Sequence, residues 1–133
     1  MGFLTRTAAR TMLAGIFIYS GYGMVNNAER YAKQASKVLP MLPDEPMLAR
    51  AHGITMLAAG STFALGIFPK LSARILALTL ITNTYVGHQF WKAEKPEDRR
   101  PQLIHFLKNV GLFGGLLYVS SDKRSQQRDE DSD

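Results

Sequence analysis

Four long apolar segments, separated by loops that carry most of the charges, fill most of the chain. They cover residues 11–28, 53–69, 75–91 and 103–121. Each is close to the ~20 residues that an α-helix needs to cross a hydrocarbon core about 30 Å thick. Because the loops leave little material for a soluble domain, the pattern predicts an all-α fold, an integral membrane four-helix bundle.

A soluble four-helix bundle is the alternative. Its helices would carry an apolar stripe on one side and charged residues on the opposite side. Segment 54–68 contains no charged residue, and the only ionisable side chain in segment 75–86 is that of Tyr85. These segments leave no charged face for water to solvate, so the pattern favours the membrane.

A shorter helix with different patterning is expected between the first two spans. Over residues 28–39 the apolar side chains recur at helical spacing, while four charged side chains fall on other faces. This pattern predicts a short interfacial helix on the membrane surface, although a solvated helical loop would show the same spacing. Pro40, Pro43 and Pro46 then end the helix and turn the chain into the second span.

The chain divides into a four-span transmembrane domain, residues 1–121, and a polar C-terminal tail, residues 122–133. The tail ends in Ser-Gln-Gln-Arg-Asp-Glu-Asp-Ser-Asp. Because this segment has no apolar side chains to bury, we expect it to be disordered.

The composition excludes several kinds of functional site. The chain has no cysteine, which excludes disulfides, thiolate metal sites, covalently attached haem and thiol redox chemistry. Any redox role must therefore use a bound cofactor or a partner. Because the sequence also shows no paired carboxylates and no clear metal set, we expect no intrinsic catalytic activity and no intrinsic cofactor. The net charge of +5 is interpreted as loop charge that meets anionic lipid, not nucleic acid.

The orientation of the chain across the membrane is predicted from the Lys and Arg residues of its loops. An even number of spans places both termini on one side, and Lys and Arg are divided almost equally between the two sides. The very short second loop carries Lys70 and Arg74, which favours its side as cytoplasmic. We therefore expect both termini in the cytoplasm.

Polar residues within the spans define a candidate ligand-binding site. If the helices alternate in direction, the ends of spans one and three meet the beginnings of spans two and four at one membrane face. The candidates there are His52, His88, Trp91, His105, Lys108 and Asn109. Ionisable groups inside membranes usually face a protein interior, which makes Lys108, about one turn deeper than His105, the most telling of them.

The same residues allow a plainer interpretation. His, Trp and Lys are common anchors at the headgroup level, and an asparagine can bond to nearby backbone. No metal site is predicted, because no helix carries two histidines at i and i+4 and no carboxylate accompanies them in the spans. Hydrogen-bond donors beside apolar walls would suit a quinone or isoprenoid head group, so a quinone is the cofactor to test.

Small residues along the spans are interpreted as packing positions. They occur in spans one, two and four, and the pair Gly111 and Gly115 forms a small-xxx-small motif. This motif predicts that span four makes the closest helix contact.

Several short motifs resemble the DoxX family of small four-span membrane proteins, in order and spacing, from about Arg10 to Tyr118. The matching elements are Arg10 with Leu13-Ala14, Ser20-Gly21, the stretch Gly66-Ile67-Phe68-Pro69-Lys70-Leu71-Ser72-Ala73, His88-Gln89-Phe90-Trp91, His105-Phe106-Leu107-Lys108-Asn109 and Gly114-Gly115-Leu116-Leu117. The resemblance implies a protein of the bacterial cytoplasmic membrane, similar to subunits of oxidoreductase assemblies, some of them quinone-linked. It does not supply a reaction for this chain.

One position departs from the family pattern. Family members often carry a glutamate in span two, and the corresponding residue here is Met56. A role that depends on that carboxylate is therefore not expected.

Two functions from different classes follow. The favoured one is an accessory or scaffold subunit of a larger membrane complex, respiratory or redox, whose partners are the lipid bilayer and either that complex or further copies of the chain. The alternative is a quinone- or lipid-binding component of a membrane oxidoreductase. A transporter is less well supported, because four short spans leave little room for a pathway.

Overall fold

The computed structural model describes residues 2–41, 45–87 and 94–121. All regular structure in these ranges is helical, which confirms the all-α prediction. The helices are α1 (Phe3–Asn26), α2 (Ala28–Val38), α3 (Pro46–Leu65), α4 (Pro69–Gly87) and α5 (Pro96–Ser121). The polar tail predicted at 122–133 lies outside the described residues.

The long helices begin earlier than the apolar segments predicted. Helices α3, α4 and α5 each begin at a proline. Proline favours the first helical turn, because its fixed φ suits the helix and its missing N–H would have no partner there. Apolarity alone therefore located the helices but placed their first residues too late. The short helix is found as α2, and its place on the membrane surface stays a prediction.

The turn between α3 and α4 is fixed by backbone hydrogen bonds. Gly66 adopts the left-handed conformation with φ of 76°, the Gly66 N–H donates to the Phe63 carbonyl, and the Ile67 N–H donates to the Thr62 carbonyl. This pair of bonds is a Schellman motif, which ends a helix and satisfies its last carbonyls. The Ser72 hydroxyl lies 2.7 Å from the Thr62 hydroxyl and ties the start of α4 to the same turn.

We expect Gly66→Ala to destabilise the protein by about 1 kcal/mol, because a Cβ is disfavoured at positive φ. The Arg10 side chain, 2.9 Å from where that Cβ would be, must also move. Unfolding of detergent-solubilised protein by denaturant titration measures the effect. Gly15→Ala is the matched control, because nothing lies within 4 Å of its Cβ and alanine favours a helix. Equal stability of the two variants would contradict the prediction.

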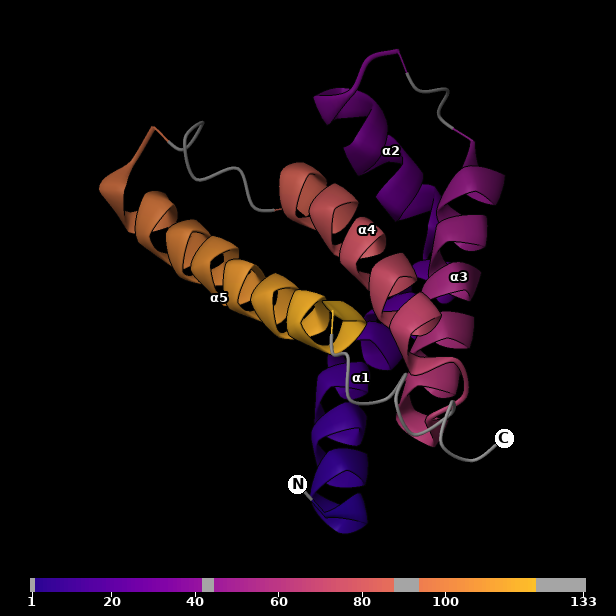
Figure 1. Ribbon diagram of the computed structural model, residues 1–133. Coiled ribbons are helices and arrows are strands. Elements are labelled where there is room, and N and C mark those ends of the chain that lie inside the picture. Colours follow the sequence, from indigo (N-terminus) through magenta and orange to yellow (C-terminus); the bar gives the residue numbers. More distant parts are fainter. Residues whose placement is uncertain (1, 42–44, 88–93, 122–133) are drawn as a thin grey trace.

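The helices alternate in direction as predicted. The beginnings of α3 and α5, the end of α4 and helix α2 lie at the end of the molecule opposite the N-terminus (Figure 1). Helix α1 packs along α3, α3 packs against α4, and α4 packs against α5. Helix α5 runs obliquely away from the others toward its own N-terminal end (Figure 1).

The closest helix contact joins α1 and α3. A Cβ added to Gly21 would lie 2.7 Å from the Gly53 carbonyl oxygen, and one added to Gly53 would lie 2.8 Å from the Gly21 carbonyl oxygen. The prediction that span four makes this contact is wrong. Gly111 has open space around it, and a Cβ on Gly115 would meet only Leu13, at 3.8 Å.

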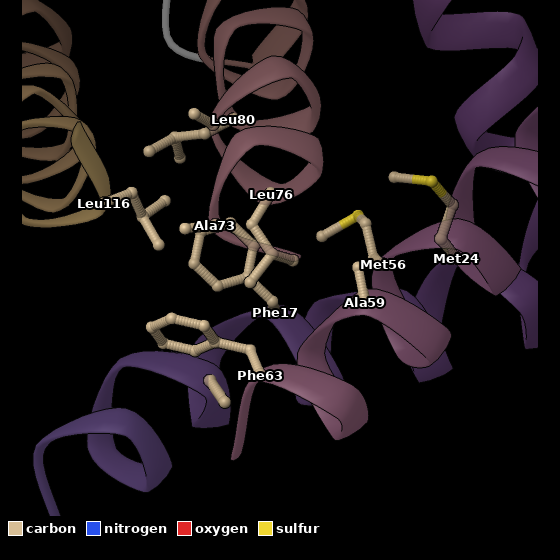
Figure 2. Packing of buried hydrophobic residues seen from close by; sticks show 11 residues of the cluster. Phe17, Met24, Met56, Ala59, Phe63, Ala73, Leu76, Leu80 and Leu116 are labelled. Atoms are coloured by element: carbon tan, nitrogen blue, oxygen red, sulfur yellow. The ribbon is translucent and has the colours of Figure 1, made fainter. Parts of the chain in front are cut away.

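The core forms where four helices converge. Phe17 of α1 and Phe63 of α3 are almost fully buried, and Leu76 of α4 and Leu116 of α5 complete the same cluster. Figure 2 shows Leu116 directed toward this cluster from α5. Leu112, Phe113 and Val119 also pack against the cluster, so the C-terminal half of α5 joins this oblique helix to the rest.

Among the helices in the described ranges, α5 alone is long and apolar enough by composition to cross a membrane. Its most apolar stretch of 18 residues has a mean hydropathy of 1.3, and 11% of that stretch is buried. A core helix of a soluble protein would be mostly buried, so this exposure fits a helix that faces lipid or another protein. The four-span arrangement as a whole stays a prediction.

Candidate functional site

A cavity of about 500 Å³ lies between α1, α2, α3 and α4, at the end of the molecule opposite the N-terminus. We call it the α1–α4 cavity. Its volume falls within the roughly 300–1,000 Å³ of ordinary ligand pockets. The residues that line it are Ser20, Met24, Tyr31, Ala32, Gln34, Ala35, Glu45, Leu48, Ala49, His52, Thr82, Asn83, Val86 and Gly87.

A polar pair from two helices lies in this cavity. His52 Nε2 of α3 is 3.0 Å from Asn83 Oδ1 of α4. The Asn83 amide nitrogen donates to the Met56 sulfur at 3.3 Å, which is a weak acceptor. The pair therefore joins α3 to α4 and places hydrogen-bonding groups beside the apolar side chains of the cavity.

Met56 also bears on the comparison with the family pattern. It stands where the family resemblance expects a glutamate, and the structure places it next to the polar pair, with 1% of its surface exposed. A thioether at this position supplies apolar volume and a weak acceptor but no charge. The departure from the family pattern therefore leaves a thioether and no carboxylate beside the polar pair.

Asn109, another predicted site residue, lies on the other side of α4. Its amide nitrogen donates to the Thr84 hydroxyl at 3.0 Å, and it is the one buried polar residue in the described part of α5. The two residues lie in a groove of about 280 Å³ between α4 and α5, whose other walls are apolar. Neighbouring residues 83 and 84 thus serve two separate sites, because successive side chains of a helix point about 100° apart.

The remaining candidates are more dispersed. His105 lies in a surface depression near the start of α5, beside Arg100 and Pro101, and Lys108 is exposed. His88 and Trp91 lie outside the described residues. The described candidates therefore occupy separate surfaces, and a ligand-binding role for them stays a prediction.

The sequence reasoning overlooked Asn83, the partner of His52. A signal was present, because residues 82–84 read Thr-Asn-Thr within an otherwise apolar segment. An uncharged polar residue inside an apolar run does not by itself indicate a site, because an asparagine can also bond to nearby backbone. Tyr31 lies on the cavity wall formed by α2, and the helical spacing of residues 28–39 predicts only that it belongs to the apolar side of a surface helix.

Within residues 2–41, 45–87 and 94–121, no group of three or more His, Asp or Glu residues is placed to hold a metal ion. What the described site offers is hydrogen bonding beside apolar walls. This arrangement can bind and orient a small amphiphile, and Glu45 is the one carboxylate among the described residues that line the cavity.

The comparison with known families gives one match. The family model described as DoxX matches residues 2–89, which contain α1 to α4 and every residue that lines the α1–α4 cavity. No curated protein and no solved structure gives a significant match to the chain.

Proposed function

The chain belongs to the DoxX family of membrane proteins, and from this premise we propose that it is an accessory or scaffold subunit of a larger membrane complex, respiratory or redox. The observation that carries the proposal is the exposed position of Lys108 on α5, the one described helix with an 18-residue stretch apolar enough to cross a membrane. Ile104 lies one helical turn before Lys108, on the same side of α5, and is 56% exposed.

A charge on such a surface is costly in lipid. Translocon scales give about 2.5–3.5 kcal/mol for a lysine at the centre of a membrane helix, and lysines within spans usually face protein. A membrane helix of a partner, with a carboxylate or carbonyl opposite Lys108, would remove this cost. We therefore assign the exposed face of α5 to contact with a larger membrane subunit.

Purification of the native protein in a gentle detergent, followed by mass spectrometry of co-purifying subunits, tests this proposal. We expect a stoichiometric larger subunit, and we expect Lys108→Leu to reduce its recovery by about tenfold, the loss of roughly one charge-assisted hydrogen bond. Lys95→Leu removes the same charge outside the apolar stretch and should leave recovery unchanged. Unchanged recovery with Lys108→Leu, or assembly with copies of the chain alone, would refute the proposal.

A second candidate is a quinone- or lipid-binding component of a membrane oxidoreductase. The α1–α4 cavity favours it, because His52 and Asn83 place hydrogen-bonding groups beside apolar walls at a volume suited to a head group. Organic extraction of the same purified material, with mass spectrometry for quinones and lipids, measures whether such a molecule is retained.

The distribution of charge supports both termini in the cytoplasm of a bacterial cell. Arg6, Arg10, Lys70 and Arg74 lie toward the end of the molecule that holds the N-terminus, where Arg10 contacts the turn between α3 and α4. The carboxylates of the described residues belong instead to α2, to the residue before α3 and to the region where α5 begins. Because carboxylates contribute little to orientation and Lys and Arg divide almost equally between the two ends, the proposed orientation relies on Lys70 and Arg74 near the start of α4, beside a short turn.

A further inference from the structure

The hydrogen bonds of Asn83 determine which nitrogen of His52 carries a proton. The Asn83 amide nitrogen faces the Met56 sulfur, so its oxygen faces His52 Nε2 and must accept a hydrogen bond there. In the neutral imidazole a protonated Nε2 leaves Nδ1 as an acceptor. His52 therefore offers a lone pair that is suited to a hydroxyl donor.

That lone pair is available in the described structure. Asn83 is the one hydrogen-bond partner that His52 has there, and no ring nitrogen of His52 is both buried and unpaired. His52 itself is half-buried and lies on the cavity wall. A molecule inside the α1–α4 cavity can thus reach Nδ1 without displacing a protein group.

The charges around the cavity select among head groups. Glu45 is the one carboxylate among the described residues that line it, and none of these lining residues is a lysine or arginine. A carboxylate or phosphate head would therefore lose its hydration without gaining a cation, which is costly. A neutral head avoids this penalty.

The walls suit the apolar part of the same molecule. Met24 of α1, Ala32 and Ala35 of α2, and Leu48 and Ala49 around the start of α3 supply apolar surface beside the polar pair. Small alanines on both α2 and α3 leave room that larger side chains would fill. The cavity thus combines one hydrogen-bonding end with a body of apolar contacts.

We propose that the α1–α4 cavity binds a neutral amphiphile through a hydroxyl group that donates to His52 Nδ1, and that it rejects anionic amphiphiles. The chemical class includes long-chain alcohols, isoprenoid alcohols and hydroquinones. This inference rests on the second proposed function. It adds the chemistry of the head group and names His52 as the residue that recognises it.

Photolabelling of the full-length protein in phosphatidylcholine nanodiscs tests the inference. The probes are a diazirine-bearing hexadecanol and the matching hexadecanoic acid, at alkaline pH where the acid is charged. We expect saturable labelling by the alcohol in residues 31–35, 48–52 and 82–87, which line the cavity. Labelling by the acid should be at least about tenfold weaker, because its charge is not compensated.

Two variants and a control isolate the site. His52→Leu should weaken labelling by the alcohol about tenfold, as expected for one hydrogen bond. Ala35→Leu should block the cavity without touching the polar pair, so its effect does not depend on His52. His105→Leu makes the same substitution in a separate surface depression and should have no effect. Unfolding midpoints of all variants show whether the fold is retained.

The outcomes separate the two proposals. If neither probe labels the cavity saturably and extraction yields no retained molecule, the second proposed function and this inference both fail. If the alcohol labels but His52→Leu leaves it unchanged, or if the acid labels equally well, the inference alone is refuted. If His52→Leu no longer folds, the comparison of the two probes and the folded Ala35→Leu variant decide. Equal labelling by the acid, or unchanged labelling of Ala35→Leu by the alcohol, then refutes the inference.

Discussion

Gly21→Ala will destabilise the protein by about 2 kcal/mol, and Gly21→Leu will prevent stable folding. A Cβ at this position would lie 2.7 Å from a backbone oxygen of α3, at Gly53, and 3.0 Å from the Met56 Cβ. Neither atom belongs to a flexible side-chain end, so α1 and α3 would have to separate. Overfilling a well-packed interface typically costs about 1–3 kcal/mol, and leucine would force a larger separation.

The measurement is the denaturant midpoint of purified protein in mixed micelles, together with the yield of monodisperse material. Gly114→Ala and Gly114→Leu are the matched controls, because a Cβ on Gly114 meets nothing within 4 Å. Neither should lower the free energy of unfolding by more than about 0.5 kcal/mol, because surface changes usually have small effects. A Gly21→Ala protein as stable as Gly114→Ala would show that α1 and α3 do not pack this closely.

This contact also matters for the candidate site. Gly53 directly follows His52, and Met56 lies both against Gly21 and within hydrogen-bonding reach of Asn83. The closely packed pair of α1 and α3 therefore fixes one wall of the α1–α4 cavity, while α2 and α4 supply the others. Preorganisation of this kind is what a binding site on rigid elements requires.

The helices could be predicted from the sequence because long apolar runs and prolines are local signals. Residues 54–68 and 75–86 lack a charged face; α3 contains residues 54–65 of the first run, and α4 contains the whole of the second. The candidate site assumed that the helices alternate in direction, and they do so in the structure (Figure 1). Which helices pack most closely did not follow, because glycines occur in α1, α3 and α5 and the sequence does not say which of them face a neighbour.

The site was predicted only in part for a related reason. Placing residues at one depth in the membrane gives their level but not the side of the helix on which they lie. His52 and Asn109 are separated in this way, since His52 pairs with residue 83 of α4 and Asn109 pairs with residue 84. Side-chain direction around α4 depends on how it packs between α3 and α5, which a single sequence does not reveal.

Phe63→Ala should destabilise the protein by about 2 kcal/mol, roughly half of the 3–5 kcal/mol that such a change costs in a water-soluble core. Phe63 is fully buried in the cluster that it shares with Phe17 and Leu116. In a water-soluble protein the loss includes transfer of the ring from water, but a membrane protein that unfolds within lipid keeps the ring in an apolar medium. Packing contacts and the new cavity then account for the whole effect.

Unfolding of wild-type and variant protein in mixed micelles gives the difference in free energy. Phe3→Ala is the control, because Phe3 is 77% exposed near the start of α1 and should change stability by less than about 0.5 kcal/mol. A cost of 3–5 kcal/mol for Phe63→Ala would mean that the ring leaves water on folding. The size of this one number therefore distinguishes a core formed between helices already in lipid from a core formed by hydrophobic collapse in water.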